Sequence, residues 1–265
     1  MEKEYNSIPY KKYYKCLVAR RAENMQSKHR FHFSQAYDYN RVVLNTMFSD
    51  EHKSDYIAAS RIDSFKIRGR FIVTQAPLPE TFNDFWQMVY ENNCTQIVTF
   101  NALIERGYVA GHKYWPENGS QKFSAVTVNN YARDEKADFT INYYKVSGIK
   151  GTMQVEHYFY AKWPDASGTD CQSLFNLLHA VKHSNAHQSI NPTLIHCSAG
   201  VGRSCTFILI YNLIEMQQEC GKIDVYKCFF KLRLQRAYCL GSVGLYKFVY
   251  SCLNSYFTKN LKNEK

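Results

Sequence analysis

The sequence has no apolar run long enough to cross a membrane. A membrane-spanning helix takes about 20 consecutive apolar residues, and no run approaching that length occurs in the 265 residues. The first residues, MEKEY, are charged and lack the apolar segment of a secretory signal. These two absences predict a protein that has no membrane span and works in the cytoplasm.

Repeats and linkers are absent too. The chain has no internal repeat, no low-complexity segment and no stretch rich in proline, glycine or serine, which argues against repeat arrays and flexibly linked domains. A hydrophobic content of 45% over 265 residues is enough for one substantial core. We therefore predict a single domain that spans residues 1–265.

The nine cysteines include no Cys-x-x-Cys pair, a spacing typical of zinc sites and redox motifs. Their odd number and scattered positions, together with the missing signal, favour reduced thiols over disulfides. We expect no metal site and no cofactor.

Acidic residues are fewer than basic ones. The chain has 33 lysines and arginines and 23 aspartates and glutamates, which gives a net charge of +10. A basic surface attracts anions of any kind, including nucleic acid, anionic lipid and phosphorylated protein. The basic residues are spread along the chain and form no arginine-rich tract, which favours a generally basic surface over a dedicated nucleic-acid site. We expect a monomer that does not bind nucleic acid.

Hydrophobic periodicity predicts where strands and helices lie. The predicted strands cover residues 96–100, 123–129, 138–146, 153–161 and 193–196, and the three in the middle are expected to be antiparallel neighbours. The predicted helices cover residues 5–25, 81–90, 174–181, 204–219, 224–236 and 244–257. This order predicts an α/β (α+β) fold, in which a twisted mixed β-sheet is flanked by α-helices.

The seven residues from Cys197 to Arg203 carry the strongest chemical signal. They follow a buried apolar strand and precede an apolar helix. The small residues Ala199, Gly200 and Gly202 let consecutive N–H groups turn inward and form an anion-binding nest. The helix adds its positive N-terminal end, and Arg203 can hold a phosphate with two parallel hydrogen bonds.

Cys197 lies at the rim of this positive cradle. That position favours the thiolate, the nucleophilic form of cysteine, so the cradle and the sulfur together indicate attack on phosphorus. His196 is predicted to hold the loop through its ring nitrogens, and Ser204 to donate a hydrogen bond to the sulfur. A nucleotide-binding loop is the alternative for a glycine-rich segment, but neither G-x-x-x-x-G-K-[ST] nor G-x-G-x-x-G occurs here.

Trp163-Pro164-Asp165 supplies a candidate proton donor, because it follows a predicted strand and precedes a loop-like segment. A carboxylic acid on a mobile loop can close over a bound substrate and protonate the leaving oxygen, which contributes about 10²–10⁴-fold in rate. An aspartate after proline is otherwise a common turn residue. Taken alone, the residue leaves both interpretations open.

Trp163-Pro164-Asp165 and the segment His196-Cys197-x-x-Gly200-x-Gly202-Arg203-Ser204 together resemble the cysteine-dependent protein tyrosine phosphatase family. Further motifs in the same order extend the resemblance over nearly the whole chain: Asp55-Tyr56-Ile57-Ala58-Ala59-Ser60, Thr74-Gln75-Ala76-Pro77-Leu78-Pro79, Lys113-Tyr114-Trp115-Pro116 and Leu232-Arg233-Leu234-Gln235-Arg236. The compact chain is also similar to the phosphatases of insect-parasitoid bracoviruses. That likeness implies a place in the host cell cytoplasm and a host–virus interaction.

The resemblance implies hydrolysis of phosphotyrosine in proteins without a metal. Cys197 would attack phosphorus to give a cysteinyl-phosphate while Asp165 protonates the tyrosine oxygen. Water would then hydrolyse the intermediate, with Asp165 as the base. The phosphoryl oxygens would be held by Arg203 and by the backbone N–H groups of Ser198, Ala199, Gly200, Val201 and Gly202. Phosphotyrosine-containing proteins are the implied partners.

Several positions near the substrate depart from the family's pattern. Phe31 stands where the family has the tyrosine that stacks on the substrate ring, and it can still stack. Phe33 stands where the family often has an aspartate that orients the peptide, so altered peptide recognition is expected. Ala166 and Ser167 replace an aromatic residue or histidine and a glycine after the acid, which predicts altered loop closure.

The family's late Q-T-x-x-Q-Y element positions the hydrolytic water, and here it reads Gly241-Ser242-Val243-Gly244-Leu245-Tyr246. Both glutamines are missing, at Gly241 and Leu245, so the first step should survive and hydrolysis of the intermediate should be slow. The alternative is a phosphotyrosine-binding pseudophosphatase that shields its substrates. A third interpretation, a basic nucleic-acid or lipid-phosphate binder, is disfavoured by Phe31 and the implied deep pocket.

Overall fold

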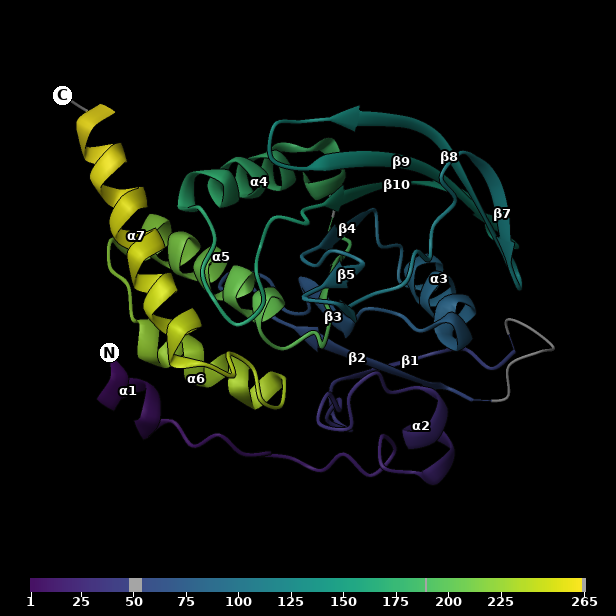
Figure 1. Ribbon diagram of the computed structural model, residues 1–265, viewed down its shortest axis with the longest axis horizontal. Helices are drawn as coiled ribbons and strands as arrows, with labels where there is room; N and C mark the ends of the chain where they lie inside the picture. Colours follow the sequence, from purple (N-terminus) through teal and green to yellow (C-terminus); the bar gives the residue numbers. More distant parts are fainter. Residues whose placement is uncertain (48–53, 189, 264–265) are drawn as a thin grey trace.

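The computed structural model describes residues 1–47, 54–188 and 190–263. In this part of the chain, nine strands form one mixed sheet in the order β1-β2-β3-β11-β4-β10-β9-β8-β7. Helices lie on both of its sides (Figure 1). The predicted fold class, a twisted mixed sheet flanked by helices, is confirmed. No helix of the described ranges combines the length and the apolar character that crossing a membrane requires.

Parallel pairing is confined to the centre of the sheet. The strand β11 (Thr193–Cys197) runs parallel to β3 (Phe71–Gln75) and β4 (Gln96–Thr99), and β4 runs parallel to β10 (Gly151–Phe159). Parallel strands end at the same edge, so the loops after β11 and β4 leave the sheet on one side. The other strands pair antiparallel: β1 (Arg41–Val43), β2 (Tyr56–Ile62), β7 (Gly119–Phe123), β8 (Val126–Glu135) and β9 (Thr140–Gly148).

Both faces of the central strands are buried. Neighbouring residues of a strand point to opposite faces, and the structure places them in two separate hydrophobic cores: Ile72 and Val73 of β3, Ile97 and Val98 of β4, and Leu194 and Ile195 of β11. The first residue of each pair packs in the core that contains α3 (Phe82–Glu91). The second packs in the core on the opposite face.

Four helices build that second core: α4 (Cys171–His183), α5 (Arg203–Cys220), α6 (Val225–Gln235) and α7 (Val243–Asn263). Figure 1 shows α5 between the sheet and the long yellow helix α7. Every residue of α5 from Arg203 to Met216 is buried, as expected for a helix that neighbours surround on all sides. The helices predicted over 81–90, 174–181, 204–219, 224–236 and 244–257 are confirmed.

The helix predicted over residues 5–25 is wrong. Two short helices, α1 (Glu2–Ser7) and α2 (Ala22–Ser27), flank a segment without regular helix. That segment is held by tertiary contacts, because the Arg233 guanidinium donates to the Ile8 carbonyl and Cys16 packs in a small core with Tyr37. Contacts with distant parts of the chain outweigh local helix propensity here.

The strand predicted over residues 123–129 is two strands. A turn at residues 124–125 separates β7 from β8, and Ser124 adopts a positive φ of 51°. The two strands pair as a hairpin, with Phe123 opposite Val126. The apolar pattern runs through the turn, so periodicity alone does not reveal it.

Two buried histidines on central strands of the sheet are held neutral by burial. His157 on β10 and His196 on β11 both contact the hydroxyl of Thr99 through their Nε2 atoms, each at 2.8 Å. Burial lowers the pKa of His196 to about 3 and that of His157 well below its ordinary value.

We expect the protein to lose stability as the pH falls from about 6.5 towards 4. Unfolded histidine titrates near 6.5, whereas folded His196 keeps its neutral form down to about pH 3. In this interval the unfolded state binds the additional proton, so each such histidine lowers the free energy of unfolding by about 1.4 kcal/mol per pH unit. The midpoint of thermal unfolding, measured between pH 7 and pH 4.5, tests this. His157→Gln should flatten the dependence and the exposed His183→Gln should not; equal slopes in both variants would contradict it.

Candidate active site

The segment with the strongest sequence signal joins the central strand to the most buried helix. The strand β11 ends at Cys197 and α5 begins at Arg203, so residues 198–202 form the loop between them. The side chain of Cys197 is buried, with 3% of the residue exposed. This is the strand–loop–helix arrangement that the sequence predicted.

The carbonyl groups of Cys197 and of the loop residues 198–202 point away from the centre of the loop, and each accepts a hydrogen bond from a protein group. Cys197 and Ser198 accept from the Ala76 N–H at 2.8 and 3.0 Å, Ala199 accepts from Ser34 Oγ, Gly200 from Arg236 Nε at 3.2 Å, Val201 from Leu240 N at 2.9 Å and Gly202 from Thr206 N at 2.9 Å. In a trans peptide unit, the N–H points away from the preceding carbonyl. The N–H groups of Ser198 to Arg203 therefore point to the opposite side, which is the arrangement that an anion-binding nest requires.

Gly200 allows this turn to form. Its φ is +66°, and a Cβ at this position would lie 2.1 Å from the Thr74 carbonyl oxygen on β3. Both the backbone conformation and the space exclude any larger residue. The loop is thus pressed against β3, which keeps its N–H groups in place before a ligand arrives.

A cavity of about 250 Å³ opens above the loop. Cys197, Ser198 and Val201 line it together with Phe31 and Asp165. The structure therefore brings the predicted aromatic wall and the predicted acid to the same cavity as the cysteine, although they lie more than 30 residues from it in the sequence.

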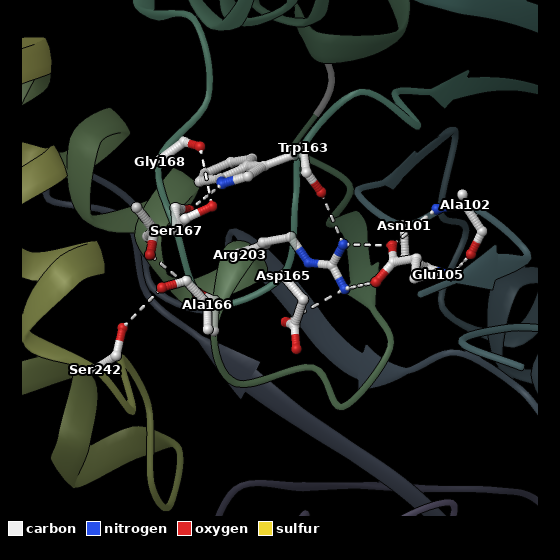
Figure 2. A network of polar contacts seen from close by, with 12 residues as sticks. Asn101, Ala102, Glu105, Trp163, Asp165, Ala166, Ser167, Gly168, Arg203 and Ser242 are labelled. Carbon is white, nitrogen blue, oxygen red and sulfur yellow. Dashed lines mark hydrogen bonds and ion pairs between the residues drawn. The ribbon is translucent and has the colours of Figure 1, made fainter. Parts of the chain in front are cut away.

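Arg203, the residue after the loop, is buried, with its side chain 1% exposed. Its fork is held by Glu105, with Nη1 2.6 Å from Oε1 and Nη2 3.1 Å from Oε2 (Figure 2). Burial lowers the pKa of Arg203, but the charges of Cys197 and Glu105 outweigh burial and raise it above its ordinary value. The guanidinium Nε is buried and has no hydrogen-bond partner among the described residues, so one donor remains for an anion.

Glu105 is one site residue that the sequence did not reveal. It lies on β5 (Ile104–Glu105), a two-residue strand paired with β6 (Tyr108–Val109), and Ala102 N donates to its Oε1 at 3.1 Å. A single glutamate in a short, partly exposed segment carries no recognisable pattern. Its importance follows from contact with an arginine 98 positions away.

The predicted acid loop reaches over the same arginine. Arg203 Nη1 donates to the Trp163 carbonyl at 2.9 Å, and Nη2 lies 3.6 Å from Asp165 Oδ1 (Figure 2). The Trp163 ring is buried and donates from Nε1 to the Ser167 carbonyl at 2.8 Å, while the side chain of Asp165 is 64% exposed. The loop thus has an anchored base and an exposed carboxyl group that lines the cavity and is ion-paired with Arg203.

The residues that follow Asp165 lie against helix α7 and against Ser242, the residue just before that helix. Ala166 adopts a positive φ of 59°, and its carbonyl accepts from Ser242 Oγ at 3.3 Å (Figure 2). At Gly168 a Cβ would lie 2.4 Å from the Phe248 ring. The non-glycine residue in the left-handed region costs about 1 kcal/mol or more, so these contacts hold the loop in a specific shape.

His196 and Ser204, which lie on either side of the Cys197–Arg203 segment, differ in their hydrogen bonding. His196 Nε2 contacts Thr99 Oγ1 and Tyr114 Oη, each at 2.8 Å, so this nitrogen faces the sheet. Ser204 Oγ is buried without a hydrogen-bond partner among the described residues. The predicted hydrogen bond from Ser204 to the sulfur of Cys197 is therefore not formed in this structure.

Aromatic and aliphatic side chains shape the rest of the cavity. Phe31 and Phe33 stack with ring centroids 5.4 Å apart. Leu245 lines the cavity at the position of one missing glutamine. Tyr10 occupies the space beside the other, because its Oη lies 3.0 Å from where a Cβ on Gly241 would be. Sequence reasoning missed Tyr10, which comes from the segment wrongly predicted as helix.

A cysteine before a glycine-containing loop, with a carboxyl group 3.6 Å from the arginine that follows this loop, is the arrangement of the cysteine-dependent phosphatase class. The chain belongs to the protein-tyrosine phosphatase family, whose model matches residues 25–255.

Similar proteins include receptor-type members of the family. The chain is 33% identical to the tyrosine-protein phosphatase Lar-like of Caenorhabditis elegans over 88% of its length, and 30% identical to the receptor-type tyrosine-protein phosphatase alpha of Mus musculus over 83%. It is 32% identical to the receptor-type tyrosine-protein phosphatase F of Bos taurus over 85%. The aligned parts make up 11%, 27% and 12% of these three relatives, so the chain spans only a small share of each.

Proposed function

We propose that this protein hydrolyses phosphotyrosine in proteins through a cysteinyl-phosphate intermediate. The observation that carries the proposal is the meeting of three groups at one cavity: the Cys197 sulfur, the converging loop N–H groups and the Asp165 carboxyl group. A nest of N–H groups takes a tetrahedral anion, a cysteine provides the nucleophile and a carboxylic acid provides the proton.

In the first step, Cys197 Sγ attacks phosphorus and the bond from phosphorus to the phenolic oxygen breaks. Asp165 gives its proton to that oxygen, and tyrosine leaves. The loop N–H groups and the free Nε–H of Arg203 stabilise the charge on the phosphoryl oxygens, where fixed donors act most strongly because they need no reorganisation. Glu105 keeps the guanidinium oriented by holding the other side of its fork.

In the second step, water attacks the cysteinyl-phosphate and the sulfur–phosphorus bond breaks. Asp165, now a carboxylate, accepts a proton from the water, and inorganic phosphate leaves. In this proposal Ser204 assists by donating its hydroxyl, which has no hydrogen-bond partner among the described residues, to the departing thiolate. Phe31 supports the choice of tyrosine, because a deep aromatic wall suits a phenyl ring and leaves a shorter phosphoserine out of reach of the floor.

The second step is the slower one in this proposal. Gly241 and Leu245 provide no amide group to hold the attacking water. The cavity at these positions is lined instead by an aliphatic chain and the Tyr10 ring. Leu245 offers a water molecule no hydrogen bond, and of these two positions only the one beside Gly241 has a polar group, the Tyr10 hydroxyl, in place of the amide.

Burst kinetics test the function directly. The protein is mixed with a chromogenic aryl phosphate, and product release is followed with time. Sustained turnover supports the phosphatase, and a fast stoichiometric burst followed by a slow phase supports the slow second step. Binding of a phosphotyrosine peptide without any product release would instead establish the pseudophosphatase.

We expect Asp165→Asn to lower kcat for a phosphotyrosine peptide by about 10²-fold or more, because the amide cannot donate a proton to the leaving oxygen. The loss should be much smaller for nitrophenyl phosphate, since nitrophenolate leaves without protonation. Steady-state rates on the two substrates measure this. Asp134→Asn, which removes an exposed carboxylate paired with Lys136, is the control. Equal losses on both substrates would contradict the role of Asp165.

We expect Leu245→Gln to raise the steady-state rate severalfold and to leave the burst phase unchanged. The new amide would face the cavity beside Gly202, whose Cβ position is 3.4 Å from Leu245 Cδ1, and would hold a water molecule. Leu245→Met keeps the size without the amide and serves as the control. A glutamine at Gly241 should not help alone, because the Tyr10 hydroxyl occupies the space. An unchanged slow phase in Leu245→Gln would contradict this explanation.

We infer that residues 1–265 act as one monomeric phosphatase domain, in the cytoplasm, on phosphotyrosine proteins and without nucleic acid. A viral origin and a host–virus interaction remain predictions from the sequence.

A further inference from the structure

Two cysteines outside the active site lie with their sulfur atoms almost in contact. Cys171 Sγ and Cys252 Sγ are 3.0 Å apart, although the residues are separated by 81 positions. Cys171 is the first residue of α4, and Cys252 lies in the middle of α7. Both are free thiols. A disulfide needs a sulfur–sulfur distance of about 2.05 Å, so closing the gap takes a side-chain movement of about 1 Å.

The two thiols differ in their surroundings. Cys171 is partly exposed, whereas Cys252 is completely buried. Burial and the neighbouring Cys171 raise the pKa of Cys252, which keeps it a thiol at neutral pH. An oxidant from solution therefore reaches Cys171 first, and Cys252 is placed as the resolving thiol beneath it.

This pair lies at the point where the acid loop meets α7. Cys171 follows the loop directly and comes after Asp170, whose carboxylate caps α4 by accepting from Ser173 N at 2.7 Å. On α7, Phe248 packs against Trp163 with ring centroids 5.6 Å apart. Phe248 and Cys252 are four residues apart and so lie on the same face of the helix. One face of α7 thus carries both the thiol and the ring that supports the loop.

We propose that Cys171 and Cys252 form a reversible disulfide that restrains the acid loop. The reaction needs an oxidant, and a small peroxide is the class that suits a partly exposed thiol. The bond would fix the first residue of α4 to α7 and so immobilise the end of the loop that carries Asp165. The oxidation itself stands without the proposed function, whereas its effect on turnover rests on it.

Formation of the disulfide takes two steps. The Cys171 thiolate attacks one peroxide oxygen, the oxygen–oxygen bond breaks, and a sulfenic acid forms as hydroxide leaves and takes up a proton. Cys252 sulfur then attacks the sulfur of that sulfenic acid and the sulfur–oxygen bond breaks. The thiol proton of Cys252 leaves with the hydroxide as water. In total, two thiols and one hydrogen peroxide give one disulfide and two waters.

A restrained loop should slow turnover. In this proposal the acid loop moves away from the cavity to admit a protein substrate and to release phosphate, and such motions limit kcat in many enzymes. With its end fixed to α7, opening becomes rarer. We expect kcat for a phosphotyrosine peptide to fall about threefold to tenfold on oxidation, and to return when a dithiol reductant opens the bond.

The first experiment detects the bond without using activity. The Cys197→Ser chain, which lacks the sulfur of the active site, is treated with an equivalent of hydrogen peroxide. Its intact mass should fall by two hydrogen atoms, and digestion without reductant should link the peptides that contain Cys171 and Cys252. The same chain with Cys171→Ser should keep its mass. An unchanged mass, or a bond mapped to another pair such as Cys205 and Cys239, would overturn the proposal.

The second experiment measures the consequence. Wild-type protein is oxidised while inorganic phosphate occupies the cavity, freed of peroxide and phosphate, and assayed before and after reduction. Cys171→Ser should have the wild-type reduced activity and lose the response to oxidation. Cys252→Ala should lose it as well, after its thermal unfolding shows that it is folded. A mapped disulfide with unchanged kcat would overturn the restraint on the loop. Reduced protein without any turnover would instead contradict the proposed function and leave the disulfide result intact.

Discussion

Turnover of an aryl phosphate should disappear in Cys197→Ser, with kcat lower by about 10³-fold or more. A serine hydroxyl is not ionised at neutral pH, so the cavity would lose its nucleophile. The cradle itself should persist, because its N–H groups are oriented by outward carbonyl contacts that do not involve the sulfur. Binding of a phosphotyrosine peptide should therefore remain, and calorimetry measures it beside the rate assay.

The exposed Cys220→Ser at the end of α5 is the matched control, since it makes the same chemical change outside the cavity. It should keep the full rate and the same sensitivity to thiol alkylation at the active site. A rate for Cys197→Ser within tenfold of wild type would mean that another group attacks phosphorus. Loss of peptide binding along with the rate would mean that the sulfur also organises the cradle.

A comparably large loss should follow from Arg203→Lys, with kcat/KM lower by roughly 10²–10³-fold, the range for losing a donor to a charged transition state. Lysine keeps the positive charge but cannot replace a planar fork. It cannot bind both oxygens of Glu105, the Trp163 carbonyl and a phosphoryl oxygen at once. The substitution thus weakens phosphate binding and loosens the acid loop together.

Two measurements separate these effects. Competitive inhibition by inorganic phosphate reports the loss of phosphate binding, and the ratio of rates on a peptide and on nitrophenyl phosphate reports the loss of loop position. Glu105→Gln keeps Arg203 and the shape of its partner, so it should show a smaller loss in both. Arg203→Lys with phosphate binding within threefold of wild type would contradict a direct contact between the guanidinium and the phosphoryl group.

Most of the fold was predictable because it follows local patterns. The central strands are short apolar runs, and α5 is an apolar segment that starts directly after a glycine-containing loop. The two wrong predictions, the helix over residues 5–25 and the single strand over residues 123–129, concern segments whose structure the local pattern does not reveal. The segment between α1 and α2 takes its shape from Arg233 and Tyr37, far away in the sequence. The turn at residues 124–125 interrupts a pattern that looks continuous.

The candidate site also has one part that local sequence predicts and one part that it does not. Residues 197–203 are contiguous, so their chemistry can be interpreted from the order of small residues, cysteine and arginine. The groups that orient them are not contiguous. Ser34 and Arg236 hold the loop carbonyls, and Ser242 holds the carbonyl of Ala166 in the acid loop. No spacing rule connects such residues before the chain has folded.

The sequence by itself predicted the candidate nucleophile, the candidate anion-binding loop and the candidate acid, because seven consecutive residues and one tripeptide contain the necessary groups. Only the tertiary structure decided that Glu105 holds the fork of Arg203, that Tyr10 occupies the space beside Gly241, and that Cys171 meets Cys252. Chemistry that depends on one segment can be predicted from local order. Chemistry that depends on contacts between distant segments is set by packing, which brings together residues that no local pattern relates.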